Sequence, residues 1–169
     1  MTATSRFVSL VPSTTETLLA LGADVIACTR FCEQPDLVQV GGTKNPDIDA
    51  IVALQPAVVM LDREETRVED HDELVRRGVP VLVSDVRSVD DALSFVDDLC
   101  DRFDLARPLR FDGAMSAAPV RARRTAFVPI WRRPWMSING ATYGGSVLGR
   151  IGVDLVTAES EVAYPVVEL

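Results

Sequence analysis

The sequence FVSLVPSTTETLLALG, residues 7–22, joins a short apolar run directly to a segment with helical spacing. Residues 7–11 carry the large apolar and β-branched side chains that are typical of a buried strand. Ser13 and Glu16 form an S-x-x-E pattern, which predicts a capped helix start, and Gly22 predicts the helix end. This stretch therefore predicts a strand followed at once by a helix.

The same alternation of strand and helix continues through the first hundred residues. The expected strands are VIAC (25–28), AVVML (57–61) and PVLVSD (80–85). The expected helices are one opened by Asn45-Pro46-Asp47, one that carries Val68, Leu74 and Val75 and ends at Gly78, and one capped by Ser88 and Asp91. Continuous apolar runs such as AVVML are buried on both faces of parallel sheets. The alternation therefore predicts an α/β lobe with a parallel sheet and right-handed crossovers.

The pattern breaks in the second half of the chain, where prolines, a glycine and scattered arginines predict a connector. TAFVPIW (125–131) then restarts a strand, and SVLGRIGV (146–153) has the spacing of a helix. We expect three parts: an N-terminal lobe at 1–104, the connector at 105–124 and a partial C-terminal lobe at 125–169. One or two strands and one helix cannot enclose a core, so the second lobe is expected to be incomplete or to pack on the first.

Composition and charge exclude several functions. The chain has 169 residues, is 47% hydrophobic and 25% charged, and contains no apolar run near the ~18–20 residues of a membrane span. Its net charge of −8 argues against nucleic-acid binding, and the arginines of 105–135 lack the interleaved aromatic residues of a nucleic-acid groove. The N-terminus shows no basic segment followed by an apolar one, so we expect a cytoplasmic location unless the printed start omits a leader.

Thiol and metal chemistry have little support in the sequence. The three cysteines, Cys28, Cys32 and Cys100, fit neither a disulfide framework nor a zinc site, and we expect them to be buried. A reactive pair of Cys28 and Cys32 is the alternative. His71 lies in the charged run EDHDE and is expected at the surface rather than on a metal ion.

Polar residues follow several expected strands, at the edge where α/β sheets bind ligands. Ser13 lies at a helix N-terminus, where it either caps the helix or faces a ligand. The segment GGTKNP (41–46) matches neither phosphate-loop pattern, and is either a turn or a ligand-facing loop. The segment REE (63–65) reaches the same edge, but nothing nearby supplies the nucleophile or metal that catalysis by paired carboxylates needs.

The segment IWRRPWM contains both tryptophans of the chain, Trp131 and Trp135. The two arginines between them are hard to bury, because each guanidinium needs paired acceptors. Pro134 stiffens the segment, and each indole N–H seeks a hydrogen-bond partner. We therefore expect this segment to form one wall of a ligand-binding cleft. Packing of the tryptophans into a core is the alternative.

Six segments occur in the order found in one known family. They are FVSLVPSTTETLLALGA, TRFCEQP, VGGTKNPDIDAIVALQPAVVM, REETR, PVLVSDVRSVDDAL and VPIWRRPWMSINGATYGG. Together they resemble the substrate-binding proteins of iron-siderophore and cobalamin ABC transporters, in particular the branch called helical backbone metal receptors. The resemblance implies an α/β fold like that of class III periplasmic binding proteins. Two Rossmann-like lobes with parallel sheets are joined by a helical or irregular backbone segment, here with an incomplete second lobe.

The resemblance also implies a function. It implies a monomeric, non-enzymatic receptor without an intrinsic cofactor, which binds a small-molecule metal chelate: a cobalamin-like corrinoid, haem or a ferric siderophore. The implied protein partner is an ABC transporter permease, and family members are typically periplasmic or anchored outside the membrane. The alternatives are a cytoplasmic metallocofactor-handling protein or enzyme partner, with Cys28 and Cys32 as its only reactive groups, or a fragment without independent function.

Ligand contacts in this family come from loops at the strand ends. The residues that the resemblance assigns to ligand binding are Ser13, Arg30, Phe31, Thr43, Lys44, Asn45, Arg63, Glu64, Glu65, Trp131, Arg132, Trp135 and Tyr143. Asp49 falls where the family often carries a glutamate that docks onto a permease arginine. An exposed carboxylate favoured by the first turn of a helix explains Asp49 equally well. No residue is expected to bind a metal ion directly.

Overall fold

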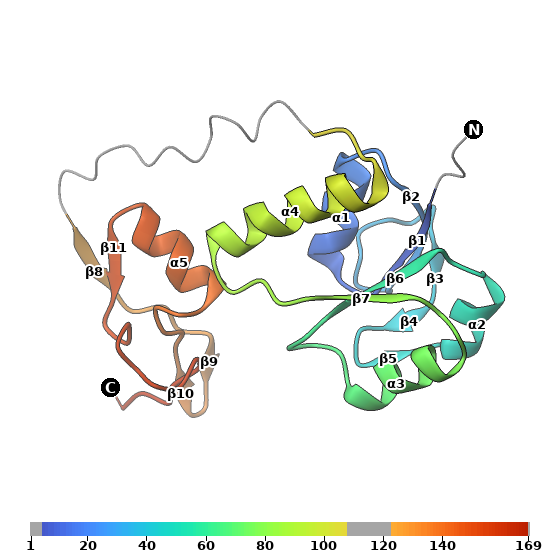
Figure 1. Cartoon of the computed structure of the whole chain (residues 1–169). Coiled ribbons are helices and arrows are strands. Elements are labelled where there is room, and N and C mark those ends of the chain that lie inside the picture. The colour runs from blue at the N-terminus through green and yellow to red at the C-terminus, as the bar shows by residue number, and fades with distance from the viewer. Residues whose placement is uncertain (1–4, 108–122, 169) are drawn as a thin grey trace. The chain divides into compact units, whose positions relative to one another are not determined.

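The computed structural model describes residues 5–107 and 123–168, and it divides the chain into two compact units (Figure 1). Unit 1 comprises residues 1–85 and 96–108, and unit 2 comprises residues 86–95 and 109–169. Most of the predicted connector at 105–124 lies outside the described residues. The domain boundaries that we expect from the sequence therefore remain a prediction.

Unit 1 is built on a five-stranded sheet in the order β3-β2-β1-β6-β7. The strands are β1 (Arg6–Ser9), β2 (Asp24–Cys28), β3 (Val38–Gln39), β6 (Val58–Asp62) and β7 (Val81–Ser84). Every pairing in this sheet is parallel. The chain leaves β1 toward β2 and later returns to its other side with β6, so the topological switch point lies between β1 and β6. The expected α/β class with a parallel sheet is confirmed.

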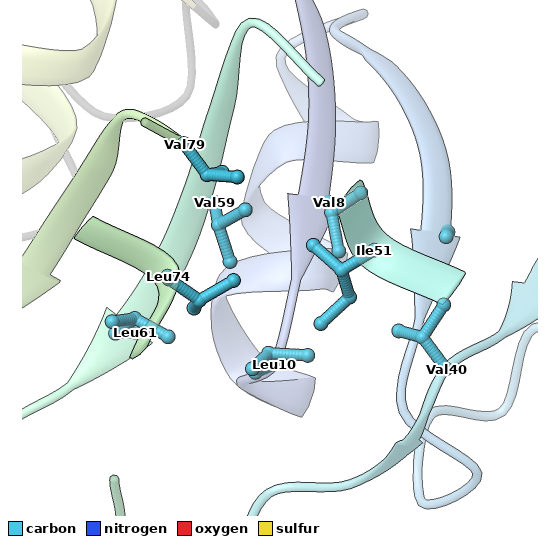
Figure 2. Packing of buried hydrophobic residues seen from close by; sticks show 9 residues of the cluster. Val8, Leu10, Val40, Ile51, Val59, Leu61, Leu74 and Val79 are labelled. Atoms are coloured by element: carbon cyan, nitrogen blue, oxygen red, sulfur yellow. The ribbon is translucent and has the colours of Figure 1, made fainter. Parts of the chain in front are cut away.

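The core of unit 1 lies on both faces of the central strand, because successive side chains of a strand point to opposite faces. Val8 is fully buried in a cluster with Ile51 of α2 (Ile48–Ala53) and Leu74 of α3 (Val68–Arg76), as Figure 2 shows. Its neighbour Phe7, also fully buried, meets the ring of Phe103 edge-on, with 4.8 Å between the ring centroids. Helices α1 (Pro12–Ala20) and α4 (Val89–Phe103) complete the described helices of the first 107 residues.

Two predicted helix starts are wrong. Helix α1 begins at Pro12, with Val11 as its N-cap and no side-chain cap, so Ser13 does not form the expected capping box. Proline suits the first helical position because its φ is already helical and because an N–H there would have no partner within the helix. Pro46 belongs instead to the short hairpin of β4 (Gly41–Gly42) and β5 (Asn45–Pro46). Helix α2 starts after it, and Asp47 accepts a hydrogen bond from the Ala50 N–H at 3.0 Å.

The predicted cap of α4 is confirmed. The Asp91 N–H donates to Ser88 Oγ at 3.0 Å, and the Asp91 carboxylate accepts from the Arg87 N–H at 3.1 Å. The helix extends to Phe103, three residues beyond the end near Cys100 that the sequence pattern predicts. Its first residues belong to unit 2 and its remaining residues to unit 1.

Unit 2 contains one parallel β–α–β element among its described residues. Strands β8 (Arg124–Ala126) and β11 (Val153–Leu155) pair in parallel, with α5 (Tyr143–Arg150) between them in the chain. A separate antiparallel hairpin follows β8 and consists of β9 (Trp131–Arg132) and β10 (Trp135–Met136). The expected continuous strand over 125–131 is therefore wrong, because it ends at Ala126. The expected helix at 146–153 starts three residues earlier, where Thr142 caps it by accepting from the Gly145 N–H at 3.2 Å.

Candidate functional site

The ligand-facing candidates of unit 1 lie at one edge of its sheet. Because all five strands are parallel, their carboxyl ends share that edge, which we call the strand-end rim. The rim consists of the segments 10–13, 29–32, 41–45, 63–66 and residue 85, which follow the strands. It contains every sequence-predicted ligand residue of the first lobe.

Arg30 and Phe31 follow β2 and form a stacked pair on the rim. The Arg30 guanidinium carbon lies 4.9 Å from the centroid of the Phe31 ring, within the range of a cation–π interaction. The Arg30 N–H donates to the Gly41 carbonyl at 2.9 Å, which ties this loop to the β4–β5 hairpin. The Phe31 side chain is 59% exposed, so its ring offers an aromatic surface to a ligand.

Ion pairs continue the rim from the hairpin to the last strand. Lys44 Nζ lies 3.2 Å from Glu65 Oε2, which joins the hairpin to the loop after β6. Arg63 Nη1 lies 3.1 Å from Asp85 Oδ2, which joins that loop to the end of β7. Exposed pairs of this kind contribute only about 0–1 kcal/mol each. They orient the charged groups at the rim more than they stabilise the fold.

Asp62 shapes the loop that carries the REE segment, a role that the sequence interpretation missed. Its Oδ1 accepts hydrogen bonds from the N–H groups of Glu64 at 2.9 Å and Glu65 at 3.2 Å. Its Oδ2 accepts from the hydroxyl of Ser84 at 3.0 Å. An aspartate at a strand end that binds backbone N–H groups two and three residues later is a recognisable turn pattern, and this pattern could have identified Asp62.

Ser13 is exposed at the second residue of α1, near the end of β1. Within residues 5–107 and 123–168, no side-chain hydrogen bond joins it to the other rim residues. Thr15, two residues beyond the rim segment 10–13, is fully buried, and its Oγ1 lies 3.4 Å from the Cys32 sulfur. The structure therefore ties α1 to the rim through Thr15 rather than through Ser13.

All three cysteines are free and buried, as expected. Burial, together with the neighbouring Cys32, raises the pKa of the Cys28 thiol from its ordinary value of 9.0 to about 12. Cys32 is held by the hydroxyls of Thr15 and Thr29, each 3.4 Å from its sulfur. A thiol that stays protonated is a poor nucleophile, so Cys28 is unsuited to reactive thiol chemistry at neutral pH.

The two tryptophans of unit 2 lie on opposite faces of the β9–β10 hairpin. Trp135 pairs with Arg132, and Met136 pairs with Trp131. Directly paired residues of antiparallel strands share a face, whereas neighbours in one strand do not. The guanidinium carbon of Arg132 accordingly lies 5.9 Å from the centroid of the Trp135 ring. The indole N–H of Trp131 donates to the Arg133 carbonyl at 3.2 Å. A ligand on one face of this hairpin therefore meets only one of the two tryptophans, and the role of the segment as a wall of a cleft stays a prediction.

Tyr143 is the first residue of α5 and is 47% exposed. The loop before it is organised by Asn139, which the sequence interpretation missed. The buried Asn139 side chain donates to the Ser160 carbonyl at 2.8 Å and accepts from the Ala141 N–H at 2.9 Å. These bonds fix the approach to the Thr142 cap and hence the position of Tyr143.

Asp49, the predicted docking carboxylate, is exposed in the first turn of α2. Its Oδ1 lies 2.5 Å from Arg77 Nη1, and Arg77 also pairs with Glu73 at 2.7 Å. Hydrogen bonds from Arg76 and Arg77 lower the pKa of Glu73 to about 2. An arginine of a partner protein would therefore have to compete with Arg77 for the carboxylate of Asp49.

The described part of the chain, residues 5–107 and 123–168, contains neither a metal-ion cluster nor a membrane-spanning helix. No group of three or more His, Cys, Asp or Glu side chains is arranged to hold a metal ion there. No helix in this part of the chain is long and apolar enough to cross a membrane.

Comparison with known proteins defines the class of this molecule. Residues 8–106, more than half of the chain, match the family model described as periplasmic binding protein. The chain belongs to that family. The match covers most of the sheet of unit 1 and the whole strand-end rim, so the rim lies within the part of the chain that the family model describes.

Several individual proteins of known function or structure are similar to this chain. A vitamin B12-binding protein of Yersinia pestis is 25% identical over 178 aligned residues, which cover 96% of this chain. The chain spans 64% of the length of that relative. Among solved structures, the periplasmic vitamin B12-binding protein of Vibrio cholerae matches with a TM-score of 0.74 at 20% identity, over 98% of this chain and 71% of its own. A periplasmic haem-binding protein of Vibrio cholerae matches with a TM-score of 0.68 at 18% identity, and the match covers 98% of this chain and 71% of that protein.

Proposed function

We propose that this chain binds a bulky metal chelate, such as a cobalamin-like corrinoid, haem or a ferric siderophore, as part of a receptor for ABC-type import. The observation that carries the proposal is the strand-end rim, where an exposed aromatic ring, amide and hydroxyl groups and charged side chains meet along one edge of a parallel sheet. The names of the relatives, which bind vitamin B12 or haem, favour the same ligand class.

Each part of the rim suits one part of such a ligand. The exposed face of Phe31 stacks on a flat macrocycle or apolar arm. Thr43 and Asn45 offer hydrogen bonds to amide or carboxylate edges. Arg30, Lys44 and Arg63 supply positive charge, with Glu64 and Glu65 beside them. Within unit 2, the proposed contacts are Arg132, Trp135 and Tyr143, whereas Trp131 lies on the other face of the hairpin.

The proposal describes a monomeric binding protein rather than an enzyme. The buried thiol of Cys28, with its raised pKa, argues against the alternative of a thiol-dependent enzyme partner. Asp49 is proposed to meet a permease arginine by exchanging its bond to Arg77. We propose the periplasmic or externally anchored location that is typical of the family, instead of the cytoplasmic location expected from the N-terminus. Subcellular fractionation of cells that express the whole protein would test this proposal.

A titration tests the proposal. Cyanocobalamin, haemin and a ferric hydroxamate siderophore are each added to the chain and followed by absorbance and calorimetry. Saturable binding of at least one probe with a 1:1 ratio is expected. Failure of all three probes to saturate at roughly 100 μM, which corresponds to about −5.5 kcal/mol, would overturn the proposal.

A pair of variants tests whether the strand-end rim is the site. Phe31→Ala is expected to weaken binding of the probe, because it removes the exposed ring. Val68→Ala is the matched control, since Val68 is 69% exposed on α3 and lies outside the rim. Equal binding by the two variants would exclude the rim as the binding surface.

A further inference from the structure

Gly42 occupies a crowded position behind the ligand-facing side chains of the rim. A Cβ atom at this position would lie 2.5 Å from Asn45 Oδ1, 3.1 Å from Phe31 Cε2 and 3.3 Å from Arg30 Nη2. All three atoms belong to side chains that the sequence assigned to ligand binding. The space that a side chain at position 42 would need is therefore filled by three groups of the candidate site.

Side-chain atoms crowd Gly42, whereas backbone atoms crowd Gly41. Gly41 has φ +87°, and a Cβ there would lie 2.6 Å from the backbone oxygen of Asn45. Gly41 is thus required by the turn itself, whatever the rim does. Gly42 has no positive φ, so its backbone accepts an L-residue, and only the packing of the rim opposes one.

We propose that Gly42 is a positioning residue of the binding site: its missing side chain lets Arg30, Phe31 and Asn45 converge into one rigid platform. The inference rests on the proposed function. Arg30 reaches Gly42 while its guanidinium lies over the Phe31 ring, so the stacked pair is held between the hairpin and solvent. Pre-ordering of the ring and the cation reduces the entropy that ligand binding would otherwise lose.

The direct consequence concerns substitution by alanine. A methyl group at position 42 must displace Asn45 Oδ1, because real Cβ atoms essentially never approach another atom to 2.5 Å. It must also push the Phe31 ring by a few tenths of an ångström, because a contact of 3.1 Å is tighter than nine in ten real Cβ contacts. The ring and the guanidinium then separate or tilt. The hairpin backbone has no reason to change, since no backbone atom is among the three nearest atoms.

The test uses Gly42→Ala, Phe31→Ala and the double variant, with Gly149→Ala as the control. Gly149 lies in α5, and a Cβ there meets nothing within 4 Å. Cyanocobalamin and haemin are the probes. Gly42→Ala is expected to weaken binding of the bound probe by about five- to tenfold, and the double variant is expected to bind no more weakly than Phe31→Ala. Gly149→Ala is expected to bind like the wild type.

A second readout does not need a ligand. In nitrogen–proton NMR spectra, the Arg30 Nε–H resonance carries a ring-current shift from Phe31. Gly42→Ala is expected to move this resonance toward its position in Phe31→Ala, with the amide resonances of the central strand unchanged. An unmoved resonance, or wild-type affinity in Gly42→Ala, would overturn the inference.

The two proposals fail in different ways. If the wild type binds neither these probes nor a ferric siderophore, the proposed function fails, and a moved resonance would show Gly42 to be a packing residue only. If the wild type binds and Phe31→Ala weakens binding while Gly42→Ala does not, the proposed function stands and the role of Gly42 is refuted.

Discussion

Trp131 and Trp135 lie on opposite faces of the β9–β10 hairpin, so replacing each one separately by alanine should have different effects on ligand binding. A ligand on one face of the β9–β10 hairpin meets either Trp131 or the stacked pair of Arg132 and Trp135. The face with both a cation and an aromatic ring suits a macrocycle with anionic or amide edges better. We therefore expect Trp135→Ala to weaken ligand binding and Trp131→Ala to leave it within about twofold of the wild type.

The expected magnitudes follow from exposure and contact. Loss of a central aromatic contact costs about 2 kcal/mol in binding, which is roughly a 30-fold increase in Kd. Trp131 is 64% exposed. If the side chain has an area of ~250 Å², about 90 Å² is covered, so its removal costs at most ~2 kcal/mol of stability. Trp135 is more buried than Trp131, so a difference in stability between the two variants would not by itself identify the ligand-binding face, whereas their affinities would.

The assay is a calorimetric titration of both variants with cyanocobalamin or haemin, whichever saturates the wild type, together with thermal melting. Trp131→Phe and Trp135→Phe are the controls, because each keeps an aromatic ring on its own face. Equal loss of affinity in the two alanine variants would refute the facing argument. A large fall in melting temperature with unchanged affinity for Trp135→Ala would show that this side chain is core.

Three further predictions concern unit 1. The pKa of Cys28 in the folded protein lies above its ordinary value of 9.0, so the contribution of this thiol to stability is complete below about pH 9 and is lost as the pH rises toward 12. Alkylation of the native protein at pH 8 should therefore be slow, and rapid labelling of Cys28 would contradict its burial. Leu74→Ala, in the fully buried core, should lower the unfolding free energy by about 2–5 kcal/mol in urea titrations, and a loss below about 1 kcal/mol would place Leu74 outside the core. Asp47→Ala should cost about 1 kcal/mol through loss of the α2 cap, while Asp47→Asn should keep most of it; equal losses would exclude a capping role.

The alternation of strands and helices could be predicted because it depends on short-range patterns. Val58, Val59 and Met60 form a continuous apolar run, and they are buried in the sheet as such a run predicts. Helix starts were less predictable where two signals competed. Ser13 follows a proline that itself suits the first helical position, and Pro46 stands next to an aspartate that caps the helix better.

The candidate site was partly predictable for a topological reason. Parallel strands bring their carboxyl ends to one edge, so Arg30, Lys44 and Arg63 could be assigned to the same rim without knowledge of their contacts. Gly42 lies in the same rim, but its proposed positioning role could not be assigned in this way. Its importance depends on how Arg30 and Phe31 fold back on the hairpin, and no local pattern in the sequence encodes that contact.

The hairpin of unit 2 shows why two tryptophans four residues apart do not share a face. On one continuous strand, residues four apart share a face, because side chains alternate with a period of two. The turn at Arg133 and Pro134 reverses this relation: residues three apart become paired, as Arg132 and Trp135 are, and residues four apart fall on opposite faces. Trp131 therefore shares its face with Met136, which forms a bridge to Val166 on the far side of β10. One tryptophan belongs to a cationic aromatic face and the other to an apolar one, so a ligand held by one face of this hairpin needs only one of them.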